Sequence, residues 1–292
     1  MQSPSPVALA NPVPIAHYEN FPVASFLCPA HLRAPIAAIY HFARTADDIA
    51  DEGDATADER LADLAAYRAD LHNAAVGLNV NARWLQVFAP LAATIYQRQL
   101  PVQLLNDLID AFVQDTRKTA EGSGYANDAE LLDYCRRSAN PVGRLLLHLY
   151  GVKDDLALQR SDAICTALQL LNFWQDLSVD LPRGRYYLPA DACVTWGLTQ
   201  VELQTAVRTG HQPENATQMI AAQAYSARAL MLFGSELVHQ VPGRAGWELR
   251  LVVQGGLRIL DRITALNYAT LTQRPTLRTW DYVVMVWRAL WM

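Results

Sequence analysis

The chain has 292 residues, of which 51% are hydrophobic and 18% are charged, and its formal net charge is −5. This mildly acidic balance argues against nucleic acid as a partner. The sequence contains no apolar run long enough to span a membrane. The cysteines are far apart and form no CxxC pair, which excludes a disulfide scaffold or zinc site and favours a reduced, cytoplasmic protein. They are Cys28, Cys135, Cys165 and Cys193.

Helical periodicity dominates the chain from residue 35 onward. Residues 1–14 are proline-rich and lack a basic start and a long apolar core, so we expect a disordered leader and not a signal peptide. Residues 20–32 contain two prolines and predict an irregular entry to the first helix. Pro35 suits the first turn of that helix, and apolar residues then recur at helical spacing. The predicted helices cover residues 35–52, 58–78, 83–99, 102–119, 128–151, 154–179, 199–209, 215–238, 247–272 and 277–290.

Signals for β-strands are nearly absent from the sequence. It has no Asn-Gly hairpin, no sustained alternation of apolar and polar residues, and no glycine-rich phosphate loop. Pro141 and Gly143 predict a kink or break within the helix over residues 128–151. The sequence therefore predicts one all-α domain over residues 15–292, with many helices around a shared core.

Two groups of acidic residues repeat at helical spacing. Asn172, Asp176 and Asp180 are four residues apart, so an α-helix would place them on one face. Asp47 and Asp51 have the same spacing on the first predicted helix. Either group alone is equally well explained as a solvated acidic face. Two such groups, each beside an apolar segment, favour a site where hard oxygen ligands hold several Mg²⁺ ions against a diphosphate.

A departing diphosphate also needs cations and hydrogen-bond donors. Arg44 precedes the first acidic pair by three residues, and Arg185 and Tyr187 follow the second group directly, so we expect all three at the site. Arg183 is better explained as a solvated charge in a turn. The segment over residues 134–143, with its small residues, is better explained as a close contact between helices.

Aromatic residues gather in the last predicted helix. Such side chains more often belong to a core or an interface than to a pocket wall, and contact with a membrane surface stays open. They are Trp280, Tyr282, Trp287 and Trp291.

These motifs resemble those of the squalene/phytoene synthase family, the head-to-head isoprenyl diphosphate synthases, over nearly the whole chain after residue 14. The run from Asp47 to Asp51 is similar to the family's first DxxxD motif, and the run from Asn172 to Asp180 to its second, NxxxDxxxD. Residues 183–189 also resemble a family run. The resemblance implies an isoprenoid synthase helical bundle with a central apolar cavity, where several Mg²⁺ ions and the substrate diphosphate lie between the two motifs.

The resemblance also implies roles for individual residues. The implied metal ligands are Asp47, Asp51, Asn172, Asp176 and Asp180. The implied catalytic residues are Asp47, Asp51, Asp176, Asp180, Arg44 and Tyr187. The implied substrate-binding residues are Arg44, Tyr134, Gln169, Arg185 and Tyr187.

Within this family, three runs resemble the HpnC-type hydroxysqualene synthases of bacterial hopanoid pathways: residues 20–25, 136–143 and 173–175. Condensing members carry a basic or histidine residue just before a Ser-Phe pair, whereas here Pro22, Val23 and Ala24 precede Ser25-Phe26. The resemblance thus implies a lyase that starts from presqualene diphosphate. Loss of diphosphate would leave a cation that rearranges and is captured by water as hydroxysqualene, with no nicotinamide cofactor.

Two alternatives stay open at this point. One is a condensing synthase that makes presqualene diphosphate, squalene or phytoene. The other is a non-catalytic, lipid-binding accessory subunit, although such a subunit would not need both acidic motifs. Peripheral contact with the inner membrane and contacts with other enzymes of a hopanoid pathway also stay open.

Overall fold

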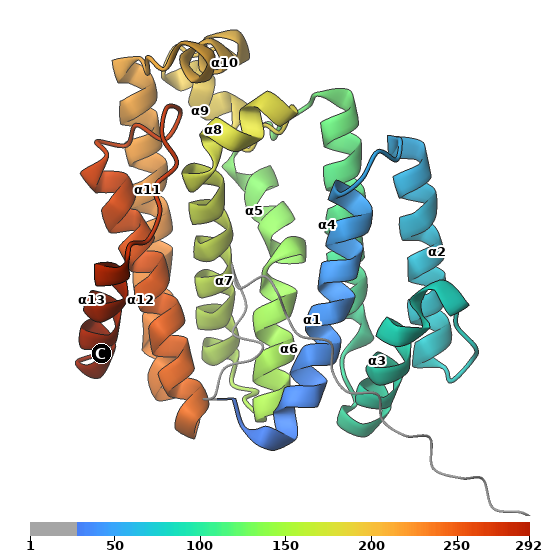
Figure 1. The fold of residues 1–292 in the computed structure, drawn as a ribbon. Helices are drawn as coiled ribbons and strands as arrows, with labels where there is room; N and C mark the ends of the chain where they lie inside the picture. Colours follow the sequence, from blue (N-terminus) through green and yellow to red (C-terminus); the bar gives the residue numbers. More distant parts are fainter. Residues whose placement is uncertain (1–27) are drawn as a thin grey trace, which may run out of the picture.

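The computed structural model describes residues 28–292, which form a bundle of long helices with shorter ones at one end (Figure 1). No strand forms within this range, where Gly124 and Tyr186 make one isolated bridge. The prediction of a single all-α domain is confirmed. The elements are α1 (Ala30–Asp51), α2 (Ala57–Ala75), η1 (Ala82–Trp84), α3 (Leu85–Arg98), α4 (Val102–Glu121), α5 (Asp128–Ser138), α6 (Asn140–Tyr150), α7 (Asp155–Gln175), α8 (Leu177–Asp180), η2 (Leu181–Arg183), α9 (Ala190–Thr195), α10 (Gln200–Thr209), α11 (Glu214–Ser235), η3 (Glu236–His239), α12 (Gly243–Ala265) and α13 (Thr279–Leu290).

Two predictions fall on residues that the structure does not describe. The proline-rich leader over residues 1–14 and the motif around Pro22, Val23 and Ala24 both lie outside the described residues. All four cysteines lie inside the described range, and each is free. Within residues 28–292, no helix combines the length and the apolar character that a bilayer crossing requires.

The first helix begins earlier than its sequence predicts. Helix α1 starts at Ala30, so Pro35 lies inside it and not in its first turn. Proline has no N–H to donate to the carbonyl four residues before it, here that of His31. Arg98 donates to that carbonyl at 3.1 Å instead. A side chain from α3 thus compensates for the missing bond, which a local pattern could not reveal.

The predicted break near Pro141 is confirmed. The chain leaves α5 at Ser138 and enters α6 at Asn140, with Pro141 in the first turn of α6. A Cβ atom on Gly143 would lie 2.4 Å from the Ser161 Oγ atom and 2.6 Å from the Cys165 Sγ atom. Glycine therefore lets α6 lie close against α7, so the preferred explanation of this segment as a helix contact is confirmed.

The core has two main parts, one on each side of the site. Helices α1 to α4 enclose one cluster, in which the buried rings of Phe42, Tyr67 and Phe88 pack together. The other cluster lies among α5, α7, α11 and α12 and includes the fully buried Trp174. In Figure 1, α1 and α4 stand on one side of α5, α6 and α7, while α11 and α12 stand on the other. Each acidic motif is therefore fixed by a different part of the core.

Two long helices end sooner than predicted. Helix α7 ends at Gln175, and Asp176 has φ −103° and ψ 12°, so Asn172, Asp176 and Asp180 do not share one continuous helix. Helix α12 ends at Ala265, and Asn267 and Tyr268 take positive φ angles of 51° and 58°.

The Gln212 side chain secures the turn that follows α12. It donates to the carbonyl of Tyr268 at 2.9 Å and accepts from the backbone N–H of Leu271 at 3.0 Å. This distant side chain stabilises a break that local helix propensity does not indicate. The short α9 was also absent from the prediction.

Candidate active site

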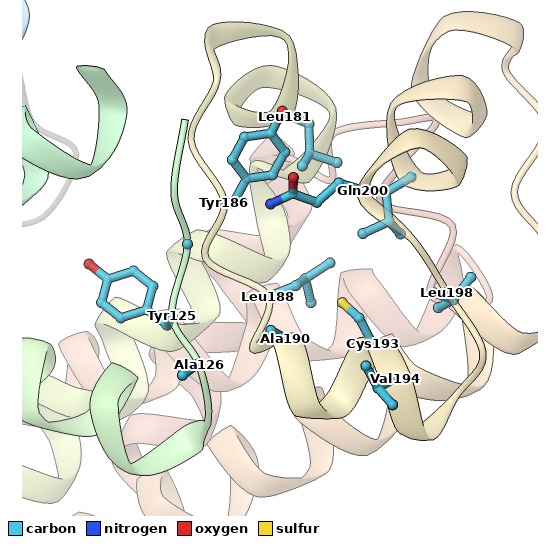
Figure 2. Close-up of a pocket in the computed structure, with 12 residues that line it drawn as sticks. Tyr125, Ala126, Leu181, Tyr186, Leu188, Ala190, Cys193, Val194, Leu198 and Gln200 are labelled. Carbon is cyan, nitrogen blue, oxygen red and sulfur yellow. The ribbon is translucent and has the colours of Figure 1, made fainter. Parts of the chain in front are cut away.

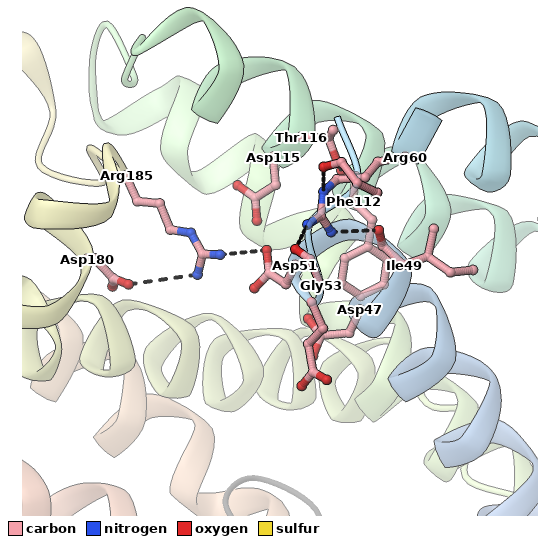
Figure 3. A network of polar contacts seen from close by, with 12 residues as sticks. Asp47, Ile49, Asp51, Gly53, Arg60, Phe112, Asp115, Thr116, Asp180 and Arg185 are labelled. Atoms are coloured by element: carbon pink, nitrogen blue, oxygen red, sulfur yellow. Dashed lines mark hydrogen bonds and ion pairs between the residues drawn. The ribbon is translucent and has the colours of Figure 1, made fainter. Parts of the chain in front are cut away.

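One guanidinium joins the two acidic motifs. The Nη2 atom of Arg185 lies 2.6 Å from the Oδ1 atom of Asp51, and its Nη1 atom lies 3.9 Å from the Oδ1 atom of Asp180. Figure 3 shows Asp51, Arg185 and Asp180 in a row, with the Asp115 carboxylate beside them. The ends of α1 and α8, far apart in sequence, therefore face each other as expected.

A tight turn sets the position of Arg185. Pro182 lies in the short helix η2, and Gly184 follows it with a positive φ of 75°, a conformation that glycine adopts without strain. The N–H of Arg185 then donates to the Asp180 carbonyl at 3.1 Å. The turn brings the Arg185 side chain back toward the carboxylates. Arg183 is exposed, as the sequence predicts for a solvated charge.

The end of α1 is held by Arg60 of α2, which sequence reasoning missed. Its guanidinium donates to the carbonyls of Ile49, Gly53 and Ala55 at 3.0, 2.7 and 3.0 Å. The Ile49 carbonyl belongs to the last turn of α1, where carbonyls lack partners within the helix, and those of Gly53 and Ala55 belong to the connection to α2 (Figure 3). Because Asp51 is the last residue of α1, Arg60 fixes the backbone that carries it.

Arg44 contacts carboxylates of its own helix and of the residue after it. It lies 2.9 Å from Asp47, 2.7 Å from Asp48 and 2.6 Å from Glu52. Loss of hydration and the nearby Asp51 raise the pKa of Asp47 to about 6, although Arg44 opposes the rise. The negative charges of the first motif therefore repel one another in a partly buried place, which favours the protonated form of Asp47.

The second motif is held by a residue that sequence reasoning also missed. Arg274, in the turn after α12, contacts Asp176 with its Nε atom at 2.5 Å and its Nη2 atom at 3.1 Å. Next to them, the Gln175 side chain donates to the Pro275 carbonyl at 2.8 Å. The sequence prediction carried the helix through residue 272 and so left a shorter loop before residue 277 than the structure has between α12 and α13.

Asp115 of α4 is a further acidic residue at the site. The Tyr134 hydroxyl donates to it at 2.5 Å, and the Tyr187 hydroxyl lies 3.4 Å from both of its carboxylate oxygens. Tyr187 stacks on Phe173 with ring centroids 3.8 Å apart. The structure thus brings Tyr134 and Tyr187 together as expected and adds Asp115 as their common partner.

A sequence signal for Asp115 did exist. Leu108, Phe112 and Asp115 follow the i, i+4, i+7 spacing of an apolar helix face, so the acid interrupts a stripe that faces the core. An acidic residue at such a position is rarely buried without a partner.

Burial also perturbs the acids nearest Arg185. It raises the pKa of Asp115 to about 7, and Asp51 adds to the rise, while the Tyr134 hydrogen bond and Arg185 oppose it. It raises the pKa of Asp180 to about 6 against the pull of Arg185. Several groups with perturbed pKa values in one place are typical of a functional site.

The remaining predicted residues lie on α7. Asn172 and Gln169 precede Asp176 within two turns, and both are partly exposed. Within residues 28–292, no three His, Cys, Asp or Glu side chains approach closely enough to hold an ion by themselves. Mg²⁺ usually takes only one or two carboxylates, with water and phosphate oxygens completing its shell. Two carboxylate pairs that meet at Arg185 fit that chemistry, and the ligand roles remain predictions.

An apolar cavity of about 120 Å³ lies among α6, α7, η3 and α12. Leu168, Ile164 and Leu147 line it, and Leu168 is one turn of α7 from Asn172. None of the predicted site residues lines this cavity, so the central apolar cavity that the resemblance implies remains a prediction. The volume of the observed cavity is below the roughly 300–1,000 Å³ of typical ligand pockets, so a long ligand would have to widen it.

A second pocket, of about 280 Å³, lies beyond the Tyr186–Leu188 segment (Figure 2). Tyr186, Leu188 and Cys193 line it, together with residues of the loop before α5 and of α9 and α10. Neighbouring side chains in an extended segment point to opposite sides. Tyr186 therefore faces this pocket while Tyr187 faces Asp115, and none of the predicted site residues lines the pocket.

Comparison with known proteins agrees with this geometry. A model of the squalene/phytoene synthase family matches residues 15–281. The chain belongs to the squalene/phytoene synthase family. It is therefore an enzyme that acts on prenyl diphosphates, and not the non-catalytic, lipid-binding accessory subunit that the sequence left open.

Several relatives are hydroxysqualene synthases. That of Sinorhizobium fredii is 34% identical over 249 residues, which cover 85% of this chain and 79% of the relative. That of Rhodopseudomonas palustris is 30% identical over 276 residues, which cover 93% of this chain and 88% of the relative. This squalene/phytoene synthase family member is therefore similar to that subgroup along most of its length.

Solved structures give the same result for the fold. The crystal structure of squalene synthase HpnC from Alicyclobacillus acidocaldarius matches with a TM-score of 0.75 and 37% identity, over 87% of this chain and 90% of that one. A dehydrosqualene synthase matches with a TM-score of 0.76 at 19% identity, over 90% of this chain and 88% of that one. The expected isoprenoid synthase bundle is confirmed.

Proposed function

We propose that this enzyme converts presqualene diphosphate and water to hydroxysqualene and diphosphate, and that it requires Mg²⁺. The observation that carries the proposal is the contact of Arg185 with both Asp51 and Asp180, because it shows that the two acidic motifs lie together. The similarity to hydroxysqualene synthases supports the choice of reaction.

The arginines would bind the diphosphate before and during its departure. Arg185 contacts acids of both motifs and Arg274 contacts Asp176 of the second, so a diphosphate between the motifs would lie within reach of both arginines. Mg²⁺, when bound, would neutralise phosphate oxygens as the carbon–oxygen bond breaks. Asp47, Asp51, Asn172, Asp176 and Asp180 would hold it. The bonding electron pair leaves with diphosphate and produces a cyclopropylcarbinyl cation.

The apolar walls would direct the fate of this cation. The mainly apolar cavity beside Leu168 would take part of the hydrocarbon, and apolar walls would keep most water away while the carbon skeleton rearranges. One water molecule then forms the new carbon–oxygen bond and loses a proton. Asp115, with a pKa of about 7, is suited to accept that proton, and Tyr134 and Tyr187 hold its carboxylate in place.

The proposal includes a cytoplasmic enzyme that meets its substrate at the inner membrane. A C30 diphosphate is almost wholly hydrocarbon and partitions into lipid, so both substrate and product would be exchanged with a bilayer. Other enzymes of a hopanoid pathway that make presqualene diphosphate or consume hydroxysqualene are the partners this role implies.

Product analysis tests the proposal. Purified enzyme is incubated with presqualene diphosphate and Mg²⁺ in ¹⁸O-labelled water, and the products are identified by mass spectrometry. We expect hydroxysqualene that carries one ¹⁸O atom, and no turnover when EDTA removes the metal. A parallel reaction receives farnesyl diphosphate alone. Formation of presqualene diphosphate there at a comparable rate, or absence of the label, would contradict the proposal and favour a condensing synthase.

A further inference from the structure

The outward face of α13 is covered by large apolar side chains. Trp280, Trp287 and Trp291 are 68%, 61% and 77% exposed, and the rings of Trp287 and Trp291 contact each other. At 100° per residue, the exposed apolar positions span about half of the helix circumference. Soluble proteins rarely expose a continuous apolar surface of this kind without a function. The exposed apolar side chains are Trp280, Tyr282, Val283, Val286, Trp287, Leu290 and Trp291. These aromatic side chains therefore do not belong to the core, which leaves an interface or a membrane surface of the explanations that the sequence allowed.

The inner face of α13 is anchored by a buried acid. Asp281 is 0% exposed and accepts hydrogen bonds from Arg258 and Arg262 of α12, at 2.6 Å each. The backbone N–H of Arg278 donates to the same carboxylate at 2.6 Å. In Figure 1, α13 lies along the outside of α12, at the edge of the bundle. The helix is therefore firmly attached, and its exposed face is a stable feature of the fold.

The charges of α13 leave its outer face without an acidic group. Its two charged residues are Asp281, which points inward, and Arg288, which pairs with Asp261 of α12 at 2.8 Å. Arg278, just before the helix, is exposed. Arg288 therefore points toward α12, whereas Arg278 lies exposed at the start of the apolar face. An apolar, aromatic face with an arginine at one end and no acid is complementary to a bilayer whose headgroups are anionic. A second copy docked face to face would instead offer Arg278 no acidic group of the opposing helix.

The residue types also suit lipid. Trp and Tyr rings combine an apolar body with one polar group, and they favour the boundary between headgroups and acyl chains. With 12 residues, α13 is shorter than the roughly 20 residues that a spanning helix needs, so it would lie along the surface.

We propose that the outward face of α13 docks the enzyme on an anionic membrane surface. The loop that leads into α13 carries Arg274 and Pro275, which contact Asp176 and Gln175. Docking therefore places the diphosphate-facing loop beside the bilayer. This consequence rests on the proposed function, because it concerns how a lipid-soluble substrate would reach the site. The docking itself does not depend on the proposed function.

Vesicle binding tests the proposal without any substrate. The full chain is mixed with vesicles of phosphatidylcholine and phosphatidylglycerol in equal parts, and the bound fraction is measured by co-sedimentation. We expect the wild type to bind and a triple variant, Trp280→Ser, Trp287→Ser and Trp291→Ser, to bind about tenfold or more weakly. A matched control replaces three exposed apolar residues elsewhere and should bind like the wild type. It carries Tyr96→Ser, Val194→Ser and Val201→Ser.

Equal binding by the two triple variants, or no binding by the wild type, would overturn the proposal. So would a wild-type dimer in sedimentation velocity that the tryptophan variant abolishes, combined with no vesicle binding. Thermal unfolding of both variants checks that they fold. Because no product is measured, failure of the proposed reaction would leave this result unchanged, and the two proposals are tested separately.

Discussion

The Arg185 guanidinium lies 2.6 Å from the carboxylate of Asp51 at the end of α1. It also faces Asp180 and thereby lies between negative charges that would otherwise repel each other. A cation held between two acidic motifs marks the place where a diphosphate with its metal ions could be bound.

Replacing Arg185 by Gln should lower kcat/KM about a hundredfold or more, because one charged donor to the leaving group is lost. Arg183→Gln provides the matched control, since Arg183 is an exposed arginine in the same turn. Its kcat/KM should match the wild type. Steady-state kinetics with presqualene diphosphate measure both, and similar losses in the two variants would refute a specific role for Arg185.

Mg²⁺ should raise the melting temperature more at about pH 8 than at about pH 5. The pKa values of Asp47 and Asp180 are both raised to about 6, so at the lower pH protons compete with the metal. Differential scanning fluorimetry with and without Mg²⁺ measures the shift. Asp180→Asn should reduce it. Asp63→Asn, which alters an exposed ion pair with Arg83, should keep it in full. An equal shift in all three proteins would show that the metal binds elsewhere.

Asp115→Asn should change how stability depends on pH. The pKa of Asp115 is about 7 in the folded protein, against roughly 4 in an unfolded chain. Between these values the folded state binds more protons, so the contribution of Asp115 to stability falls as pH rises. In EDTA, the wild type should lose on the order of 2 kcal/mol more than the variant between about pH 5 and pH 8. Urea unfolding at the two pH values gives this difference, and parallel curves would contradict the raised pKa.

The same site offers a matched pair of tyrosine variants. Tyr134→Phe removes the 2.5 Å hydrogen bond to Asp115 and should lower kcat about tenfold or more. The Tyr125 ring lies beside Tyr134, but its buried hydroxyl makes no hydrogen bond among the described residues. Tyr125→Phe should therefore leave kcat within about twofold of the wild type. Rates at saturating substrate compare the two, and the prediction fails if Tyr125→Phe is the more damaging change.

Arg60→Ala should weaken catalysis although Arg60 does not face the diphosphate. Loss of its three bonds frees the end of α1, so Asp51 would be held less firmly, and we expect kcat/KM to fall about tenfold. Arg68→Ala is the comparison, because Arg68 is also on α2 but pairs with Asp110 of α4. Unfolding free energies of both variants separate a general loss of stability from a local effect. Equal kcat/KM in the two variants would exclude a positioning role for Arg60.

The sequence alone identified much of this enzyme because its main signals are local. Helical periodicity gave the fold class, and the spacing of Asp47, Asp51, Asp176 and Asp180 depends only on the pitch of a helix. Those motifs also carry the family resemblance. The helix ends were predicted less accurately. Arg98 compensates for the hydrogen bond that Pro35 cannot make inside α1, and Gln212 stabilises the turn after α12. Both side chains are distant in sequence from the helix ends that they affect.

What only the tertiary structure decided are the contacts between distant segments. Arg274 contacts Asp176, and Asp115 lies within hydrogen-bond distance of the hydroxyls of both Tyr134 and Tyr187. The aromatic side of α13 faces outward. None of these follows from local spacing, because each depends on which helices pack together and on which side. The sequence determined the reactive groups, and the packing of the two core clusters determined which of these groups meet.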